Sequence, residues 1–174
     1  SGPDGVIEVS TGVADMKSGH PVTAKTRFYI ASTGKMMVAA AILAGVEKGE
    51  LDLDAGIWPL VNDLQVAGSL PEVEHVTLRQ LLNHTSGFPD CLSDDFVEAA
   101  SREPHRRWSE ADVLAFAYDA PSHGAPGSVF EYSNTNYVLL GHILKRSYPD
   151  MKKALGQSVL AKAGMQSTSV GASQ

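Results

Sequence analysis

Two residues near the N-terminus have the types and the spacing of an acyl-transfer site. Ser32 stands where a short apolar, β-prone segment meets a strong helix former, and Lys35 follows three residues later. Positions i and i+3 share one face of a helix, so the lysine would lie one turn above the serine. A helix start offers N–H groups and partial positive charge to an oxyanion, and a poorly hydrated lysine can act as a base. These features favour nucleophilic attack by Ser32 on a carbonyl carbon.

This stretch has two other interpretations. Ser32 could be a plain N-cap, which is a common place for serine, with Lys35 a surface charge. A phosphate-binding loop needs Gly five residues before the Gly of Gly-Lys and Ser or Thr after the Lys. Those positions hold Tyr29 and Met36, so the sequence excludes that loop.

A second group of polar residues follows a Pro- and Gly-rich loop about a hundred residues later. Tyr132 and Asn134 stand two apart at a loop-to-helix junction, and in an extended segment such residues point the same way. A phenol relays protons when nearby cations lower its pKa, and an amide can hold a carbonyl and a lysine together. The alternative is that Asn134 or Thr135 caps the next helix while Tyr132 packs in the core.

The bulk properties describe a chain that can bury a core. It has 174 residues, 43% hydrophobic and 20% charged, which fits one domain or two small ones. The net charge of −6 and the lack of a basic cluster beyond Arg106-Arg107 argue against nucleic acid, and no apolar run is long enough to span a membrane. No metal or other cofactor is expected, because the six histidines show no His-x-x-x-His pair and Cys91 is the single cysteine.

The expected elements are unevenly distributed along the chain. Antiparallel strands are predicted at Val6–Val9, with Val13, and at Arg27–Ile30, separated by a turn at Lys17–Pro21. The segment from Leu51 to Leu64 reads as irregular. Helices are predicted over 33–48, 77–83, 94–100, 110–118, 137–148 and 151–162.

Three local signals mark the ends of these helices. The first helix is apolar nearly all round, which predicts a buried core helix, and Gly49 suits its C-terminus. Thr77 opens a capping box with Gln80, and Ser109 caps a helix with acids in its first turn.

Taken together, Ser-x-x-Lys and Tyr-x-Asn resemble the serine β-lactamase and penicillin-binding protein family. The closest resemblance is to the branch with class C β-lactamases, D-alanyl-D-alanine carboxypeptidases and esterases. It extends over three ordered blocks, namely Phe28–Asp54, Val76–Pro89 and Pro126–Gly141. The resemblance implies an α/β fold of the α+β type, β-lactamase/transpeptidase-like, with an antiparallel sheet and a helical domain. Here that fold is expected to be incomplete, with few strands and mostly helix.

The resemblance also implies a role for each motif residue. Ser32 matches the nucleophile, and its N–H would be half of the oxyanion hole. Lys35 matches the lysine that helps to deprotonate it, Tyr132 the proton relay to the leaving group, and Asn134 the contact to substrate amide and lysine. His84 lies in a family-typical segment and is predicted to be structural, bonding nearby backbone at a helix end.

One part of the family pattern is not predicted here. Members carry a Lys- or His-x-Gly motif on a late strand that donates the second oxyanion N–H, and no such strand is expected after Asn134. Two strands also make a marginal sheet. A second polypeptide or a C-terminal segment is therefore expected to complete the site. The expected organisation is residues 1–50 as strands and nucleophile helix, and residues 51–174 as a helical region carrying Tyr-x-Asn.

The implied activity is a serine hydrolase that forms an acyl-enzyme on Ser32. Its substrate would be a small ester, amide, β-lactam or D-amino-acid peptide, and the sequence does not separate esterase, peptidase and β-lactamase. The alternative is a non-catalytic, hydrolase-like module that binds a partner or a peptide. The resemblance points to periplasmic or secreted bacterial proteins, with a cytoplasmic location also open.

Overall fold

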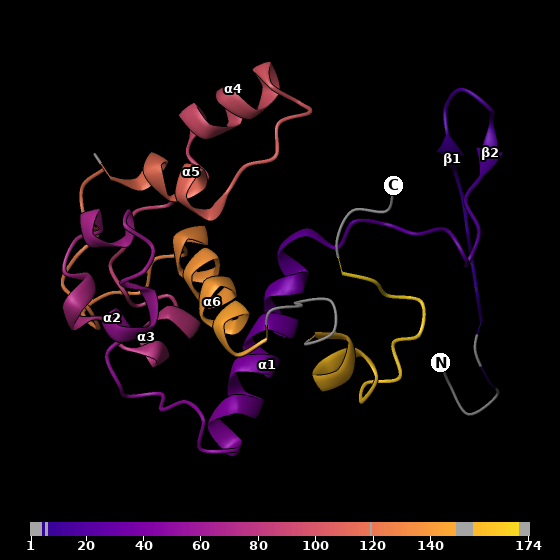
Figure 1. The fold of residues 1–174 in the computed structure, drawn as a ribbon. Coiled ribbons are helices and arrows are strands. Elements are labelled where there is room, and N and C mark those ends of the chain that lie inside the picture. Colours follow the sequence, from indigo (N-terminus) through magenta and orange to yellow (C-terminus); the bar gives the residue numbers. More distant parts are fainter. Residues whose placement is uncertain (1–4, 6, 119, 149–154, 171–174) are drawn as a thin grey trace. The chain divides into compact units, whose positions relative to one another are not determined.

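The chain divides into two compact units in the computed structural model (Figure 1). They comprise Ser1–Thr33 and Gly34–Gln174. The structure describes residues 5, 7–118, 120–148 and 155–170, and each unit is described by itself. Within the described residues no helix is long and apolar enough to cross a membrane.

The first unit contains a small antiparallel hairpin. Strand β1 (Val13–Asp15) pairs with β2 (His20–Pro21). The Asp15 carboxylate accepts hydrogen bonds from the Lys17 N–H at 2.9 Å and from the Ser18 hydroxyl at 2.7 Å, which closes the turn. The predicted turn is thus present, although its last two residues belong to a strand.

The predicted strand at Arg27–Ile30 is wrong, and so is the strand expected over Val6–Val9. Ile7 to Val9 carry no strand, and Val6 lies outside the described residues. Phe28 and Tyr29 have the apolar character of a strand but are 69% and 88% exposed. A strand forms only where a neighbouring backbone completes its ladder, and among the described residues β1 pairs with β2 instead.

The second unit is built around two helices that pack together. Helix α1 (Lys35–Glu47) lies against α6 (Asn134–Ser147), which also contacts α2 (Trp58–Val61), α3 (Leu78–Leu82) and α5 (Glu110–Leu114) (Figure 1). Helix α6 begins three residues before the predicted Tyr137. The largest fully buried side chains of this core are Phe88, Ile42, Ile57, Leu78, Leu81, Leu114, Leu139, Leu140, Ile143 and Leu144.

Helix α1 is buried on one face rather than all round. Ala41, Ile42 and Gly45 are buried against the core, whereas Met36 and Leu43 are 66% and 48% exposed. The prediction of a fully buried helix is therefore wrong for the exposed face. Its C-terminus is as predicted, because Gly49 has a left-handed φ of +72° and its N–H bonds the Val46 carbonyl at 2.9 Å.

Several helices of this unit carry their caps in their own sequence. Thr77 and Gln80 form the predicted capping box of α3, and Ser109 caps α5 in a box with Asp112. Ser93 caps α4 (Asp94–Arg102). The predicted helix over 110–118 is α5 followed by a 3₁₀ turn, η4 (Ala115–Ala117).

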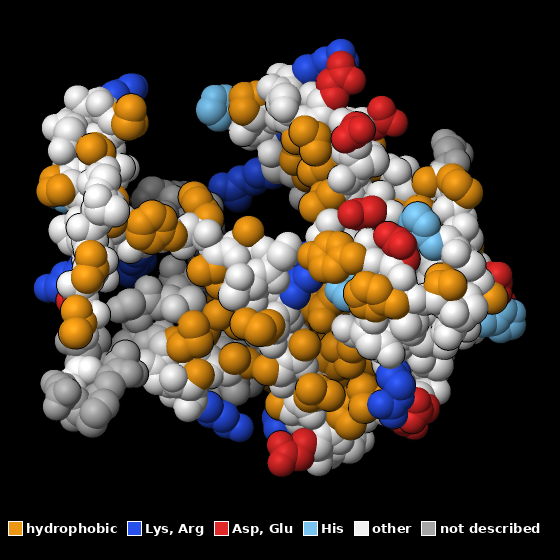
Figure 2. Space-filling view, turned by 180° about the vertical axis from the view of Figure 1, so that it is seen from behind, with side chains coloured by type: hydrophobic (Ala, Val, Ile, Leu, Met, Phe, Trp, Pro, Cys, Tyr) orange, Lys and Arg blue, Asp and Glu red, His pale blue; other side chains and the backbone are white. Residues whose placement is uncertain are grey.

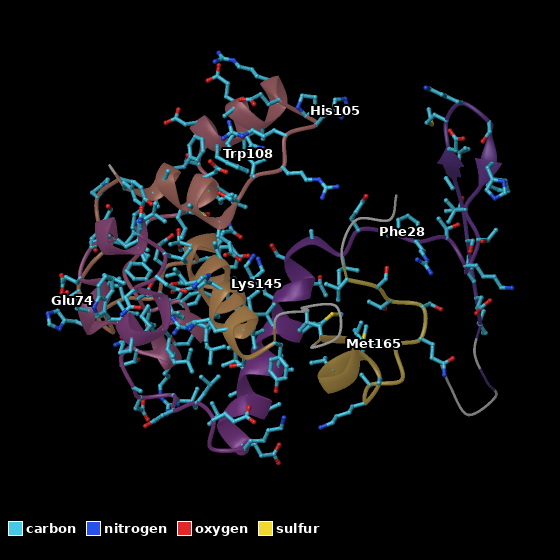
Figure 3. All side chains as sticks on the ribbon, viewed as in Figure 1. Phe28, Glu74, His105, Trp108, Lys145 and Met165 are labelled. Atoms are coloured by element: carbon cyan, nitrogen blue, oxygen red, sulfur yellow. The ribbon has the colours of Figure 1, made fainter. Side chains whose placement is uncertain are left out.

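Helix α4 carries no buried residue and meets the rest of the unit through aromatic contacts. Phe96 of α4 packs edge-on against Trp108 and Phe116, with ring centroids 5.3 and 5.4 Å away. Figure 3 labels Trp108. The Arg106 guanidinium lies 4.0 Å from the centroid of the Trp108 ring. These three rings are not part of the buried hydrophobic core of the unit.

The remaining segments are short turns and one late helix. Two 3₁₀ turns, η2 (Ala67–Ser69) and η3 (Val73–His75), lie between α2 and α3, and α2 itself falls in a segment predicted to be irregular. Of the helix expected over 151–162, residues 151–154 lie outside the described part. The rest includes a π-helix at Gly156–Leu160.

Candidate active site

Ser32 lies in a tight turn that leads directly into α1. The 3₁₀ helix η1 (Ala31–Gly34) is closed by a 3.0 Å bond from the Thr33 N–H to the Ile30 carbonyl. Ala31, next to the serine, has a left-handed φ of +44°. Alanine disfavours this conformation, and such strained residues gather at functional sites. The serine is therefore presented by a strained turn, with Gly34 rather than Ser32 as the N-cap of α1.

Lys35 joins the first motif to the second. Its Nζ donates a hydrogen bond of 2.6 Å to Asn134 Oδ1. The same nitrogen lies 5.1 Å from the ring centroid of Tyr132 and 5.6 Å from that of Tyr137, within the range of cation–π attraction. The first residue of α1 and the first turn of α6 thus meet at one nitrogen atom.

The backbone before α6 explains how Tyr132 and Asn134 both reach Lys35. Ser133 is extended, with φ −139° and ψ 129°, and is fully buried on the opposite side of the segment. Ser133 is the N-cap of α6 but makes no side-chain cap bond. Tyr132 is 42% exposed, so it is not the core residue of the alternative interpretation, and neither Asn134 nor Thr135 is the cap.

Asp90 determines which way the Asn134 amide points. Its Oδ2 accepts from Asn134 Nδ2 at 2.9 Å, and its Oδ1 accepts from the Asn134 backbone N–H at 3.0 Å. An ionised carboxylate only accepts and a lysine ammonium only donates. The amide nitrogen must therefore face Asp90 and the amide oxygen must face Lys35.

His84 also contacts the start of α6. Its Nδ1 accepts from the Ser133 N–H at 3.3 Å and lies 3.2 Å from Asn136 Nδ2. Its ring stacks on Tyr132, with centroids 4.5 Å apart, and on Tyr137, with centroids 5.2 Å apart. The Ser133 bond spans 49 positions, so the partner of His84 is distant backbone, where a nearby partner was predicted.

The surroundings of the His84 ring favour its neutral form. Burial lowers the pKa of His84 below its ordinary value, and the charge of Lys35 lowers it further. A neutral imidazole that accepts at Nδ1 carries its proton on Nε2. Burial likewise raises the pKa of Tyr137, whose hydroxyl donates to the Leu82 carbonyl at 3.2 Å.

Buried hydroxyl groups at the start of α6 form hydrogen bonds with the segment that contains Pro89 and Cys91. Thr135 Oγ1 accepts from the Cys91 N–H at 3.0 Å and donates to the Pro89 carbonyl at 2.6 Å. That carbonyl also accepts from Ser133 Oγ at 3.1 Å. Because these groups are buried, each bond replaces water that is no longer present.

The surface beside these groups is partly apolar. Phe130, two residues before Tyr132, is 68% exposed, and its ring lies edge-on to His84 with 6.1 Å between the ring centroids. Figure 2 shows hydrophobic side chains open at the surface on the face that it presents. Within the described residues no group of three His, Cys, Asp or Glu side chains is placed to hold a metal ion.

Two features of the chain were not predicted from the sequence. Asp90 was not singled out, although an acid between Pro89 and buried Cys91 is a residue that needs hydrogen-bond partners. One Lys-x-Gly triplet does follow Asn134, at Lys162-Ala163-Gly164, but it lies in an exposed turn and not on a strand.

Comparisons with known proteins agree on one group of relatives. The family model described as Beta-lactamase matches residues 4–174. Penicillin-binding protein 4* of Bacillus subtilis (strain 168) is 31% identical over an alignment of 175 residues, which covers 97% of this chain and 36% of that protein. The chain thus spans about a third of that relative's length.

Solved structures show the same likeness in three dimensions. A penicillin binding protein from Bacillus halodurans has a TM-score of 0.73 and 30% identity, covering 92% of this chain and 49% of that one. A D-amino acid amidase from Ochrobactrum anthropi SV3, complexed with L-phenylalanine, has a TM-score of 0.70 and 29% identity, covering 90% and 41%.

Proposed function

The chain belongs to the β-lactamase family, and from that premise we propose that it carries the nucleophile and the proton-transfer groups of a serine hydrolase. Ser32 is the proposed nucleophile and Lys35 its base. Tyr132 is the proposed proton relay, and Asn134 the group that holds the substrate amide and Lys35.

The proposed reaction has two stages, acylation of Ser32 and hydrolysis of the acyl-enzyme. Ser32 Oγ bonds to the carbonyl carbon of an ester or amide while its proton passes to the Lys35 amine. The bond from that carbon to the leaving oxygen or nitrogen breaks, and Tyr132 relays the proton taken up by Lys35 to the leaving group, so that both side chains return to their starting state. Water then attacks the acyl carbon, one of its protons passes through Tyr132 and Lys35 to Ser32 Oγ as the ester bond breaks, and the acid leaves.

One observation carries this proposal, the 2.6 Å bond from Lys35 Nζ to Asn134 Oδ1. An isolated Ser-x-x-Lys is common at helix starts. Lys35 is also bonded to the amide of a second motif 99 positions away, and it lies near two tyrosine rings. A catalytic site requires such contacts, whereas a lysine on the surface does not need them.

The substrate class is proposed from the relatives. Their printed names include a D-amino acid amidase and penicillin-binding proteins. We therefore rank amide bonds of D-amino acids first among the ester, amide and β-lactam substrates that the mechanism admits. The proposal also includes a further segment or a second polypeptide that supplies the third motif and the second oxyanion N–H.

Intact-mass measurement of the protein treated with a fluorophosphonate tests the nucleophile. One adduct is expected, absent in Ser32→Ala and formed much more slowly in Lys35→Ala. Lys162→Ala removes an exposed lysine from the late turn and should react like the unaltered protein. D-phenylalanine amide, a short acyl ester and a β-lactam are then compared as substrates.

Each outcome bears on the proposal. A Ser32-dependent adduct with turnover of D-phenylalanine amide supports it in full. An adduct that also persists in Ser32→Ala would assign the nucleophile elsewhere. A folded protein that gains no adduct would instead favour the non-catalytic binding module.

A further inference from the structure

Asp90 is a carboxylate that takes no direct part in the proposed reaction. It bonds Asn134, which in turn bonds Lys35. It is partly buried and accepts three N–H groups. Two belong to Asn134, at 3.0 and 2.9 Å, and the third is the N–H of Leu92 at 3.1 Å. Three charge-assisted bonds fix the carboxylate firmly in one orientation.

This orientation is passed on to Asn134. Turning the amide over would place Oδ1 against the Asp90 carboxylate, and this contact between two acceptors would become repulsive. It would also place Nδ2 against Lys35 and remove the acceptor of the Lys35 N–H. With Asp90 ionised, the amide has one favourable orientation. In that orientation Oδ1 accepts from Lys35 Nζ, as observed at 2.6 Å.

The amide in turn fixes the position of the lysine nitrogen. When the Lys35 amine donates one N–H to Asn134, the directions of its other bonds and of its lone pair are restricted. A base needs such a fixed orientation to accept a proton from a hydroxyl at a defined place. Asp90 therefore acts at a distance, through one side chain, on the group proposed to move the proton.

Asp90 has a second, purely structural effect that any test must separate. Its Oδ1 bonds the backbone N–H of Asn134, the first residue of α6, whose N-cap Ser133 makes no side-chain cap bond to the helix. A carboxylate there also interacts favourably with the helix dipole. Removing the whole side chain would weaken the helix start as well as the amide.

We propose that Asp90 is a positioning residue of the acyl-transfer site, which orients Asn134 so that Asn134 holds Lys35. The inference rests on the proposed function of Ser32 and Lys35. It assigns to Asp90 a contribution to rate beyond its contribution to folding.

The substitution Asp90→Asn separates the two effects. Asparagine keeps an Oδ1 acceptor for the backbone N–H groups of Asn134 and Leu92 and loses the second carboxylate oxygen that faces Asn134 Nδ2. We expect acylation of Ser32 by the fluorophosphonate to slow by about 10–100-fold, the range for lost outer-shell support of a site, while the thermal midpoint changes little. Asp95→Asn makes the same charge change on exposed α4 and should leave the rate unaltered.

A double-mutant cycle tests whether Asp90 acts through Asn134. In an Asn134→Ala background, Asp90→Asn should slow acylation by no more than about 2-fold, because residues in one network are not additive. Equal effects in both backgrounds, or a rate loss that follows the loss of thermal stability, would overturn the inference.

A spectroscopic readout does not depend on reactivity. In ¹⁵N–¹H spectra of the protein, the side-chain amide signals of Asn134 should move in Asp90→Asn and stay in place in Asp95→Asn. If they stay in place in Asp90→Asn, the orienting contact is refuted even when Ser32 reacts. If they move while the unaltered protein gains no Ser32 adduct, the contact stands and the assignment of a catalytic role is overturned with the proposed function.

Discussion

Helices α5 and α6 begin in opposite ways. The start of α5 is held by residues of its own sequence, because Ser109 accepts the Asp112 N–H at 3.1 Å and Asp112 Oδ2 accepts the Ser109 N–H at 2.9 Å. The start of α6 is held from 44 to 49 positions away, by Asp90 on the Asn134 N–H and His84 on the Ser133 N–H.

The difference shows how the candidate site is tied to the tertiary structure. A local capping box needs only its own four residues, the N-cap and the first three positions of the helix, so it stabilises α5 regardless of the rest of the chain. The start of α6 is satisfied only when the segment 84–91 is packed against it. Since that start carries Asn134, the geometry around Lys35 depends on contacts between distant segments, and three further predictions test this contrast.

The largest effect is expected from Gly87→Ala, in the segment that holds α6. A Cβ at Gly87 would lie 2.1 Å from the Gly124 carbonyl oxygen, and its φ of +79° already disfavours a side chain. We expect a loss of about 4 kcal/mol in the free energy of unfolding, the level of severe backbone clashes. Urea unfolding followed by far-UV circular dichroism measures it.

Gly49→Ala at the end of α1 is the matched control. Its φ is +72°, but a Cβ there would meet nothing within 4 Å. The cost should be that of the left-handed conformation alone, about 1 kcal/mol. Equal losses for the two substitutions would contradict the view that the 84–91 segment is held by close packing.

An intermediate effect is expected when hydroxyls are removed from the two helix starts. Thr135→Val leaves the buried Cys91 N–H without an acceptor and should cost about 2 kcal/mol. Ser109→Ala removes the local cap of α5 and should cost about 1 kcal/mol. Urea unfolding gives both values.

The rate of Ser32 acylation is a second measurement that distinguishes these two substitutions. Thr135→Val should slow acylation of Ser32 because it loosens the turn that carries Asn134, whereas Ser109→Ala should leave acylation unaltered. A Ser109→Ala protein that is both less stable and slower than Thr135→Val would reverse the contrast.

The smallest effect is a difference in pH dependence. The pKa of His84 is lowered in the folded protein by burial and then by Lys35, against about 6.5 in the unfolded chain. Its contribution to stability is therefore complete above pH 6.5 and declines as the pH falls below that value, because the unfolded state then binds the proton more readily. At the start of α5, hydrogen bonds from Ser109 lower the pKa of Asp112, so that start weakens only below about pH 3.9.

His84→Asn provides the comparison, because Asn tolerates the left-handed φ of +58° at this position. Between pH 7.5 and 5, urea unfolding should show the unaltered protein losing stability relative to His84→Asn. His142, which contacts Asp63 and Glu110, is present in both proteins and cancels in the difference. Parallel pH profiles for the two proteins would refute the neutral acceptor role of His84.

The fold class was predictable from the sequence to a large extent. Its two motifs and three blocks identified the β-lactamase/transpeptidase-like class, which the family match and the solved structures confirm. Local signals also placed helices well where a cap or an apolar stripe marks them, as at Thr77, Ser109 and Leu140. The first strands were misplaced because a strand depends on its partner, and Arg27–Ile30 has none among the described residues.

What the sequence alone determined is therefore local. The types and spacing of Ser32, Lys35, Tyr132 and Asn134 suggested acyl transfer. The hydroxyl groups of Thr77 and Ser109, with an amide at Gln80 and an acid at Asp112, fixed the starts of α3 and α5 within four residues of backbone. Only the tertiary structure decided that Asp90 faces Asn134 and that His84 accepts from Ser133. Those bonds join segments more than forty positions apart, and they lie where full or partial burial limits the access of water.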